Sequence, residues 1–219
     1  MNNVDIVEAW ERRVGAETAH LQEGQHINKA GLNCIFREGF RGIGTDQKVI
    51  LDYGCGGGFL GLFLFEGDYP IKQYIGVDIT LRAIKATLER LDKWKSFKRV
   101  EATKIDPKNI PDLSIFKVDI LTCFNVVQHF PDKEYFEYFF EQLNNSEIPI
   151  IILNYRKGEK LTFQDEPYKR THEINLACYN RIDDIKALLP NYKLIKSPKK
   201  NKSGFETVQF KIKEMGSME

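Results

Sequence analysis

The sequence predicts an α/β fold in which a parallel sheet carries helices on both faces. Three observations predict it. Short apolar or β-branched runs alternate with helix-spaced stretches from Lys48 onward, the first run breaks into a glycine-rich turn, and the second run ends in a carboxylate. Alternating strand and helix patterns are typical of parallel sheets, because each crossover helix packs back onto the sheet that it connects.

Five strands are expected in the main part of the chain, from five runs rich in apolar and β-branched residues. These runs are 48–53, 74–78, 99–105, 117–124 and 148–154. Helices are expected between them, where apolar residues recur at three- and four-residue spacing. The helical stretches are 59–65, 81–91 and 132–143, so they provide crossovers between successive strands.

The carboxyl-terminal region has a different pattern. Asn180 and Asp183 resemble a capping pair for a helix over 180–189. Residues 192–197 then face residues 205–212 across a lysine-rich turn, and this arrangement predicts a hairpin.

Two segments fall outside the strand and helix alternation. Residues 1–44 are expected to form an N-terminal helix, over 5–14, and a cap or lid. Residues 45–214 form the main domain, and within it the insertion 155–179 begins where the fifth strand ends. Residues 215–219 are expected to be a tail. In open α/β sheets ligands bind beyond the carboxyl ends of the strands, so the insertion starts near the expected site.

Composition limits the class of protein. A chain of 219 residues can bury one sizeable core, and its formal charge of +1 creates no global field toward nucleic acid or membranes. The first residues are polar, and no apolar run approaches the roughly 20 residues that span a bilayer. We therefore expect a cytoplasmic protein with no membrane partner.

The four cysteines are far apart in the sequence and form no Cys-x-x-Cys pair. This spacing argues against a zinc site or a disulfide framework. Cys55 lies in the glycine turn and Cys123 in an apolar strand, so both are expected to be reduced and to pack in the interior.

The turn motif Asp52-x-Gly54-x-Gly56-x-Gly58 resembles the class I, Rossmann-like methyltransferases that depend on S-adenosylmethionine. This resemblance implies a seven-stranded mixed sheet, mostly parallel, with a terminal antiparallel hairpin. Glycines at 56, 58 and 61 also fit the dinucleotide pattern, so an NAD-binding oxidoreductase is an alternative. Asp52 favours the methyltransferase, because its charge would repel a pyrophosphate at this position.

The resemblance implies S-adenosylmethionine as the cofactor and S-adenosylhomocysteine as its product. The turn residues Gly54, Cys55, Gly56 and Gly58 would lie against the amino-acid end of the cofactor. Asp52 would orient the turn or receive the cofactor's ammonium group. Asp78, with Ile79 beside it, would accept both ribose hydroxyls, and a helix N-cap is the structural alternative for Asp78.

Further along the chain, the resemblance places Asp106 against the adenine amino group, although an ordinary Pro- and Asp-rich loop explains this segment equally well. Asn125 would lie under the sulfonium at the end of the fourth strand. Gln128 and His129 would then face the acceptor. Since a histidine titrates near neutral pH, His129 is a candidate general base, with a packing role as the alternative.

The insertion contributes the remaining candidates. Tyr155 and His172 are further catalytic candidates, and Arg156, Tyr168 and Arg170 are candidate acceptor contacts. Five basic and three acidic residues lie between positions 156 and 172, which suits an anionic acceptor or, equally, a solvated lid.

The sequence therefore predicts a methyltransferase that acts on an oxygen or nitrogen of a small molecule, such as an anionic compound, a sugar or a secondary metabolite. No catalytic metal is expected, because Asn125 has no carboxylate neighbour at the end of the fourth strand. An RNA methyltransferase and a non-catalytic cofactor-binding scaffold are the alternatives. The basic residues on the terminal hairpin lack the aromatic stripe of a nucleic-acid footprint. The sequence does not identify the acceptor or the oligomeric state.

Overall fold

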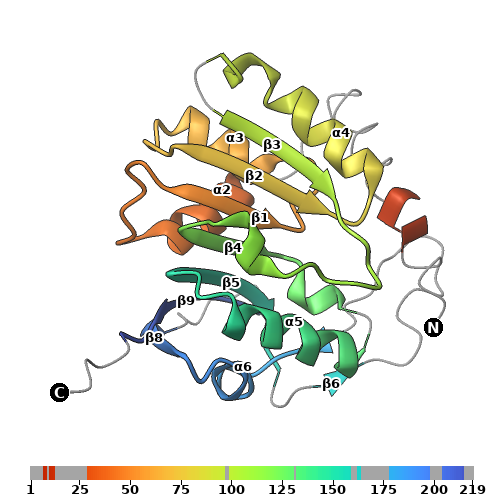
Figure 1. The fold of residues 1–219 in the computed structure, drawn as a ribbon, viewed down its shortest axis with the longest axis vertical. Coiled ribbons are helices and arrows are strands. Elements are labelled where there is room, and N and C mark those ends of the chain that lie inside the picture. The colour runs from red at the N-terminus through yellow and green to blue at the C-terminus, as the bar shows by residue number, and fades with distance from the viewer. Residues whose placement is uncertain are drawn as a thin grey trace.

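The computed structural model describes residues 7–8, 10–12, 29–96, 99–130, 132–158, 162–163, 178–197 and 204–214. A seven-stranded sheet with strand order β3-β2-β1-β4-β5-β9-β8 forms the centre of this part of the chain (Figure 1). The strands are β1 (Val49–Tyr53), β2 (Gln73–Asp78), β3 (Arg99–Lys104), β4 (Ile120–Phe124), β5 (Ile150–Arg156), β8 (Tyr192–Lys196) and β9 (Phe205–Ile212).

The first five strands are parallel, and β9 runs antiparallel between β5 and β8. This confirms the predicted mixed sheet with a terminal hairpin. The chain moves outward from β1 to β3 and then returns to β4 on the other side of β1. The carboxyl ends of β1 and β4 therefore flank the topological switch point, where α/β sheets bind ligands.

Five α-helices are described: α2 (Lys29–Phe40), α3 (Phe59–Glu66), α4 (Leu81–Arg90), α5 (Lys133–Asn145) and α6 (Ile182–Leu188). The three predicted crossover helices are confirmed. Helices α5 and α6 lie on one face of the sheet, with α2 and α3 on the other (Figure 1). Helix α4 packs beside α3: Thr87 of α4 contacts Gly58 at the start of α3, and Leu91 at the end of α4 contacts Gly61.

The two faces of the sheet carry separate aromatic cores. On the first face, Phe136 and Phe139 of α5 are fully buried over β1 and β4. On the second face, Phe36 of α2 packs edge-on against Phe124 of β4, with ring centroids 5.2 Å apart. Helix α2 was not predicted from the sequence, because its glycines and polar positions obscure the apolar face that Phe36 and Phe40 provide.

The predicted capping pair before α6 is wrong. The N-cap is Arg181, and it makes no side-chain cap hydrogen bond. Asn180 instead joins the backbone of β5's end: its amide donates to the Arg156 carbonyl at 2.9 Å, and its carbonyl accepts from Gly158 at 2.8 Å. Pairing with β5 thus overrides the local capping signal.

The insertion contains a small antiparallel pair, β6 (Thr162–Phe163) and β7 (Cys178–Tyr179). Elsewhere, Cys55 and Cys123 are buried as predicted. No helix in the described part of the chain is both long and apolar enough to cross a membrane.

Candidate active site

The glycine turn follows β1 directly. Gly54, Gly56 and Gly58 all have left-handed backbone conformations, with φ values of 76°, 50° and 75°. Glycine adopts these conformations without the steric penalty that a Cβ imposes. The amides of Gly54 and Cys55 donate to the Val77 carbonyl at 2.8 and 3.0 Å, which ties the turn to the end of β2.

Packing around the turn is dense at Gly54 and open at Gly56. A Cβ on Gly54 would lie 2.2 Å from a methyl group of Val126, so β4's end excludes a side chain there. Among the described residues, a Cβ on Gly56 would meet no atom within 4 Å. The turn therefore has free space at Gly56, where a ligand can approach the backbone closely.

Asp78 is at the end of β2 and faces the turn. Its Oδ2 accepts the Gly56 amide at 3.0 Å, and its Oδ1 accepts both the amide and hydroxyl of Thr80, at 2.9 and 3.0 Å. A carboxylate has about four acceptor positions, so Asp78 retains capacity for a ligand hydroxyl. Burial raises the pKa of Asp78, while these hydrogen bonds favour the charged form.

The N-cap alternative for Asp78 is not what the structure shows. Thr80 is the N-cap of α4, and its hydroxyl accepts the Ala83 amide at 3.2 Å. Asp78 instead holds Thr80 in place from the preceding strand. Ile79, between them, is partly buried against the core.

Asp52 lies beneath the turn and is almost fully buried. The Tyr74 hydroxyl donates to Oδ2 at 2.6 Å, and the Thr122 hydroxyl donates to Oδ1 at 3.2 Å. Burial raises the pKa of Asp52 to about 6, although both hydrogen bonds oppose the shift. Because both oxygens accept from neighbouring strands, this arrangement favours the role in which Asp52 orients the turn.

Asp106 is exposed in the loop after β3. Its Oδ1 accepts the Lys108 amide at 2.9 Å, and its backbone pairs with Asn109, so it closes a local turn. This is the ordinary-loop geometry that was the alternative for this segment. The Ile105 amide donates to the Asp78 carbonyl at 2.9 Å and holds the loop against the end of β2.

The end of β4 brings three predicted residues together. Asn125 has a left-handed φ of 58°, an unusual conformation for a residue other than glycine. The 3₁₀ helix η3 (Val127–His129) follows, and within it Gln128 is 1% exposed. Its Oε1 has no hydrogen-bond partner in the described part of the chain. His129 is half-buried, and its ring meets Trp10 edge-on with centroids 4.9 Å apart.

Tyr155 and Arg156, at the end of β5, contact β9. The buried Tyr155 hydroxyl donates to Glu206 at 2.8 Å, and burial raises its pKa well above the ordinary value. The guanidinium of Arg156 lies over the Phe205 ring, 5.2 Å from its centroid. This arrangement does not present the phenol of Tyr155 to an acceptor. His172, Tyr168 and Arg170 lie outside the described residues.

Sequence reasoning missed Asn154. Its Nδ2 donates to the Glu206 carbonyl at 3.2 Å and to the Thr207 hydroxyl at 3.0 Å. Since a carbonyl accepts only from the amino group, the amide orientation is fixed, and Oδ1 has no partner among the described residues. No sequence signal identifies Asn154, because its partners come from β9, more than 50 residues later.

The site residues that the structure describes fit an adenosyl cofactor. The space above Gly56 and the adjoining carboxylate of Asp78 match an amino-acid group and a ribose, respectively. Among the described residues, no three histidine, cysteine, aspartate or glutamate side chains are grouped as metal ligands.

Comparisons with known proteins agree with this geometry. A family model described as a methyltransferase domain matches residues 45–189. Two curated relatives are named ubiquinone biosynthesis O-methyltransferase. The protein from Leptothrix cholodnii is 32% identical over 108 residues, which are 48% of this chain and 42% of the relative. The protein from Idiomarina loihiensis is 31% identical over 89 residues, 41% and 35% of the two chains. The chain thus spans less than half the length of either relative.

Solved structures share the fold at low identity. An S-adenosylmethionine-dependent methyltransferase from Clostridium acetobutylicum has a TM-score of 0.63 at 14% identity, with 91% of this chain and 98% of the other covered. Magnesium protoporphyrin IX methyltransferase from Synechocystis, with bound S-adenosylhomocysteine, has a TM-score of 0.61 at 12% identity, with 84% and 83% covered. Because the family model covers more than half of the sequence, the chain belongs to the methyltransferase-domain family, within the class I S-adenosylmethionine-dependent methyltransferases.

Proposed function

We propose that this protein transfers the methyl group of S-adenosylmethionine to an oxygen of a small-molecule acceptor. One observation carries the proposal: the open backbone at Gly56, whose amide is held by the Asp78 carboxylate at the next strand end. The names of the two curated relatives support oxygen over nitrogen as the receiving atom.

When bound, S-adenosylmethionine supplies an electrophilic methyl group on a positively charged sulfur. Gly54, Gly56 and Gly58 would let the backbone contact its amino-acid end, and Asp78 would accept a ribose hydroxyl. Asp52 would hold the turn in shape through Tyr74 and Thr122. The carboxylates of Asp52 and Asp78 also place negative charge near the site, which favours a cationic ligand.

The acceptor side would be formed by η3 and the end of β5. The amide oxygens Gln128 Oε1 and Asn154 Oδ1 are buried, and each could accept a hydrogen bond from a hydroxyl group of the substrate. His129 would accept the proton that the reacting hydroxyl loses. Arg156, Arg170, Tyr168 and His172 remain proposed acceptor-side residues. The main contribution of the protein would be to align the reacting atoms and exclude water.

Methyl transfer from isotopically labelled S-adenosylmethionine tests this proposal. The purified protein is incubated with phenol and catechol acceptors, with amines, and separately with RNA, and the label is followed in each fraction. We expect label in the phenol or catechol fraction. Label confined to the amines or to RNA would contradict the proposed acceptor class. Cofactor binding without transfer to any acceptor would favour a scaffold.

A further inference from the structure

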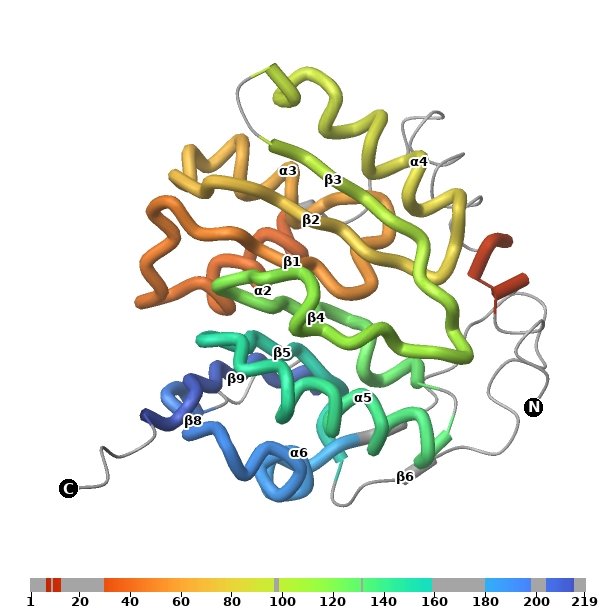
Figure 2. Tube along the Cα trace, in the orientation of Figure 1, coloured from red at the N-terminus to blue at the C-terminus, as the bar shows by residue number. Residues whose placement is uncertain are grey.

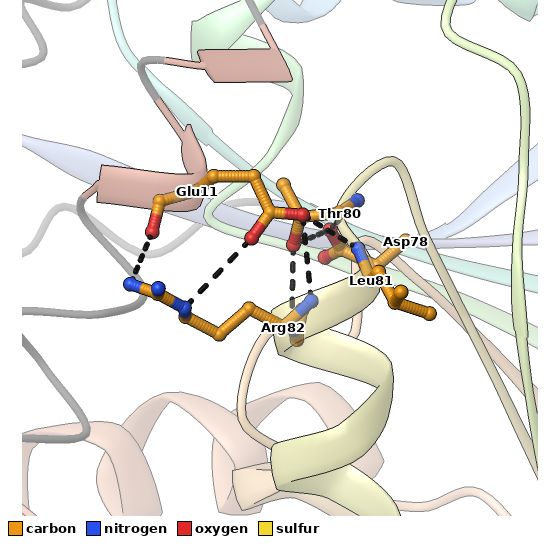
Figure 3. Close-up of polar contacts among 6 residues, drawn as sticks. Glu11, Asp78, Thr80, Leu81 and Arg82 are labelled. Atoms are coloured by element: carbon orange, nitrogen blue, oxygen red, sulfur yellow. Dashed lines mark hydrogen bonds and ion pairs between the residues drawn. The ribbon is translucent and has the colours of Figure 1, made fainter.

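The N-terminal segment makes contact with the start of α4. Glu11 Oε1 accepts the Leu81 amide at 2.8 Å and the Arg82 amide at 3.5 Å. In the reverse direction, the Arg82 guanidinium donates to the Glu11 carbonyl at 3.0 Å, and its Nε lies 3.9 Å from Oε2 (Figure 3). Glu11 is therefore held through both its side chain and its backbone.

Glu11 completes the cap of α4. The first amides of a helix have no partner within the helix. Asp78 accepts the Thr80 amide, Glu11 accepts the amides of Leu81 and Arg82, and the Thr80 hydroxyl accepts the Ala83 amide. A carboxylate is also favoured at this end of the helix dipole. Glu11 and Asp78 thus bind consecutive amides at the same helix start, and Asp78 is the residue assigned to the cofactor.

The residue next to Glu11 reaches a different strand end. Trp10 packs edge-on against His129, with centroids 4.9 Å apart and ring planes at 76°. His129 follows β4, whereas α4 follows β2, and β1 lies between these two strands in the sheet. Residues 10 and 11 therefore bridge the strand ends on either side of the glycine turn. Figure 2 shows this segment, in red, beside the start of α4.

We propose that Glu11 is a positioning residue that anchors residues 10–12 across the donor site, so that Trp10 fixes the His129 ring against the acceptor side. The inference rests on the proposed function. A ligand on the glycine turn would lie beneath this bridge. Release of the ligand would then require the Glu11 contact or the Trp10 contact to break.

Dissociation of S-adenosylhomocysteine tests the anchor directly. We expect Glu11→Ala to increase the dissociation rate, measured by surface plasmon resonance, about tenfold, because the ligand-bound state would lose a contact as strong as a typical helix cap. Glu8→Ala is the matched control. Glu8 is in the same segment and forms an exposed ion pair with Arg12 at 2.9 Å. The dissociation rate of S-adenosylhomocysteine from Glu8→Ala should stay within twofold of the wild-type rate.

Two further readouts distinguish positioning from a purely structural role. Trp10→Ala should lower the single-turnover methylation rate about tenfold, and Trp10→Phe should restore most of it, because a phenyl ring can keep the edge-on contact. The chain has two tryptophans, so Trp94→Phe leaves Trp10 as the single fluorophore. In this background, S-adenosylhomocysteine should shift the Trp10 emission, and Glu11→Ala should reduce that shift.

Equal dissociation rates for Glu11→Ala and Glu8→Ala would overturn the inference, and so would a Trp10 emission that does not respond to the ligand. Glu11→Gln provides a second variant, because its amide oxygen can still accept from the Leu81 amide. Its dissociation rate for S-adenosylhomocysteine should lie between those of the wild type and Glu11→Ala. Wild-type protein that fails to bind S-adenosylhomocysteine would instead refute the proposed function. If binding and turnover are the same in Glu11→Ala and in the wild type, the proposed function stands and only the inference about Glu11 fails.

Discussion

The proposed donor side and the proposed acceptor side of the site are organised differently. On the donor side, each carboxylate already accepts hydrogen bonds from the protein: Asp78 accepts three and Asp52 accepts two. On the acceptor side, Gln128 and Asn154 keep buried oxygens without partners in the described part of the chain. A buried acceptor left unpaired costs about 1–3 kcal/mol. The proposed donor side is therefore prearranged, whereas the proposed acceptor side keeps unused hydrogen-bond acceptors among the described residues.

Asp78→Ala should have the largest effect on the donor side. The substitution removes the charged acceptor proposed for the ribose and frees the amides of Gly56 and Thr80. The ligand loses a hydrogen bond to a charged group, worth about 1.5–3 kcal/mol, and the Gly56 amide loses its anchor, so affinity for S-adenosylhomocysteine should fall about 10²-fold or more by isothermal titration calorimetry.

Asp112→Ala is the matched control for Asp78→Ala. Asp112 accepts the amide two residues ahead, at Ser114, with the same local geometry, but it is exposed at the start of the 3₁₀ helix η2 (Leu113–Phe116). Its substitution should leave the affinity within twofold. Unchanged affinity in Asp78→Ala would remove the assignment of the donor site.

His129→Asn should affect the acceptor side and spare the donor side. If His129 takes the proton of the reacting hydroxyl, the single-turnover rate should fall about 10²-fold or more, with the affinity for S-adenosylhomocysteine nearly unchanged. The loss should shrink for phenols that are already ionised at the assay pH, because these need no base. An equal loss for ionised and neutral phenols would show that His129 acts by packing alone.

Asp52→Asn should separate stability from binding on the donor side. The pKa of Asp52 is raised from 3.8 to about 6, so the neutral carboxyl is favoured in the folded state. The protonated carboxyl therefore contributes stability to the folded protein that is fully present below pH 3.8 and is lost as the pH rises through about 6. At 1.36 kcal/mol for each pKa unit, the ionised carboxylate costs the folded protein about 3 kcal/mol at neutral pH.

The asparagine avoids this cost, and the hydroxyls of Tyr74 and Thr122 can rotate to pair with its amide. The unfolding midpoint of the ligand-free protein at pH 7.5 should therefore rise by roughly 5–10 °C, and the difference should shrink below pH 4. Cofactor affinity should fall, because the charge is lost. A variant that is less stable than wild type at pH 7.5 would contradict this account.

The donor side could be predicted from the sequence because its geometry depends on local backbone. Gly54, Gly56 and Gly58 have positive φ, and Asp78 is the final residue of a strand, so residue type and spacing define both features. The parallel sheet and its crossover helices could be predicted for the same reason, since their periodicities are local.

The acceptor side could not be predicted to the same degree, because its contacts join distant parts of the chain. Tyr155 looks available in the sequence, but Glu206 of β9 accepts its hydroxyl. Asn154 is oriented by the same strand. On the donor side, the contact of Glu11 is equally distant, because Glu11 caps a helix that begins 70 residues later. None of these pairings leaves a periodic or motif signal.

Gly56→Ala, compared with Gly42→Ala, should give the smallest of these effects on binding. Both glycines have left-handed φ, 50° and 79°, and a Cβ on either would meet no atom of the described residues within 4 Å. Both substitutions should therefore destabilise the protein by a similar amount, about 1 kcal/mol, through backbone strain. Only the methyl at position 56 would occupy the space assigned to the cofactor, so affinity for S-adenosylhomocysteine should fall about tenfold in Gly56→Ala and stay within twofold in Gly42→Ala. Equal affinities in two variants with equal losses of stability would show that the ligand does not approach the turn at Gly56.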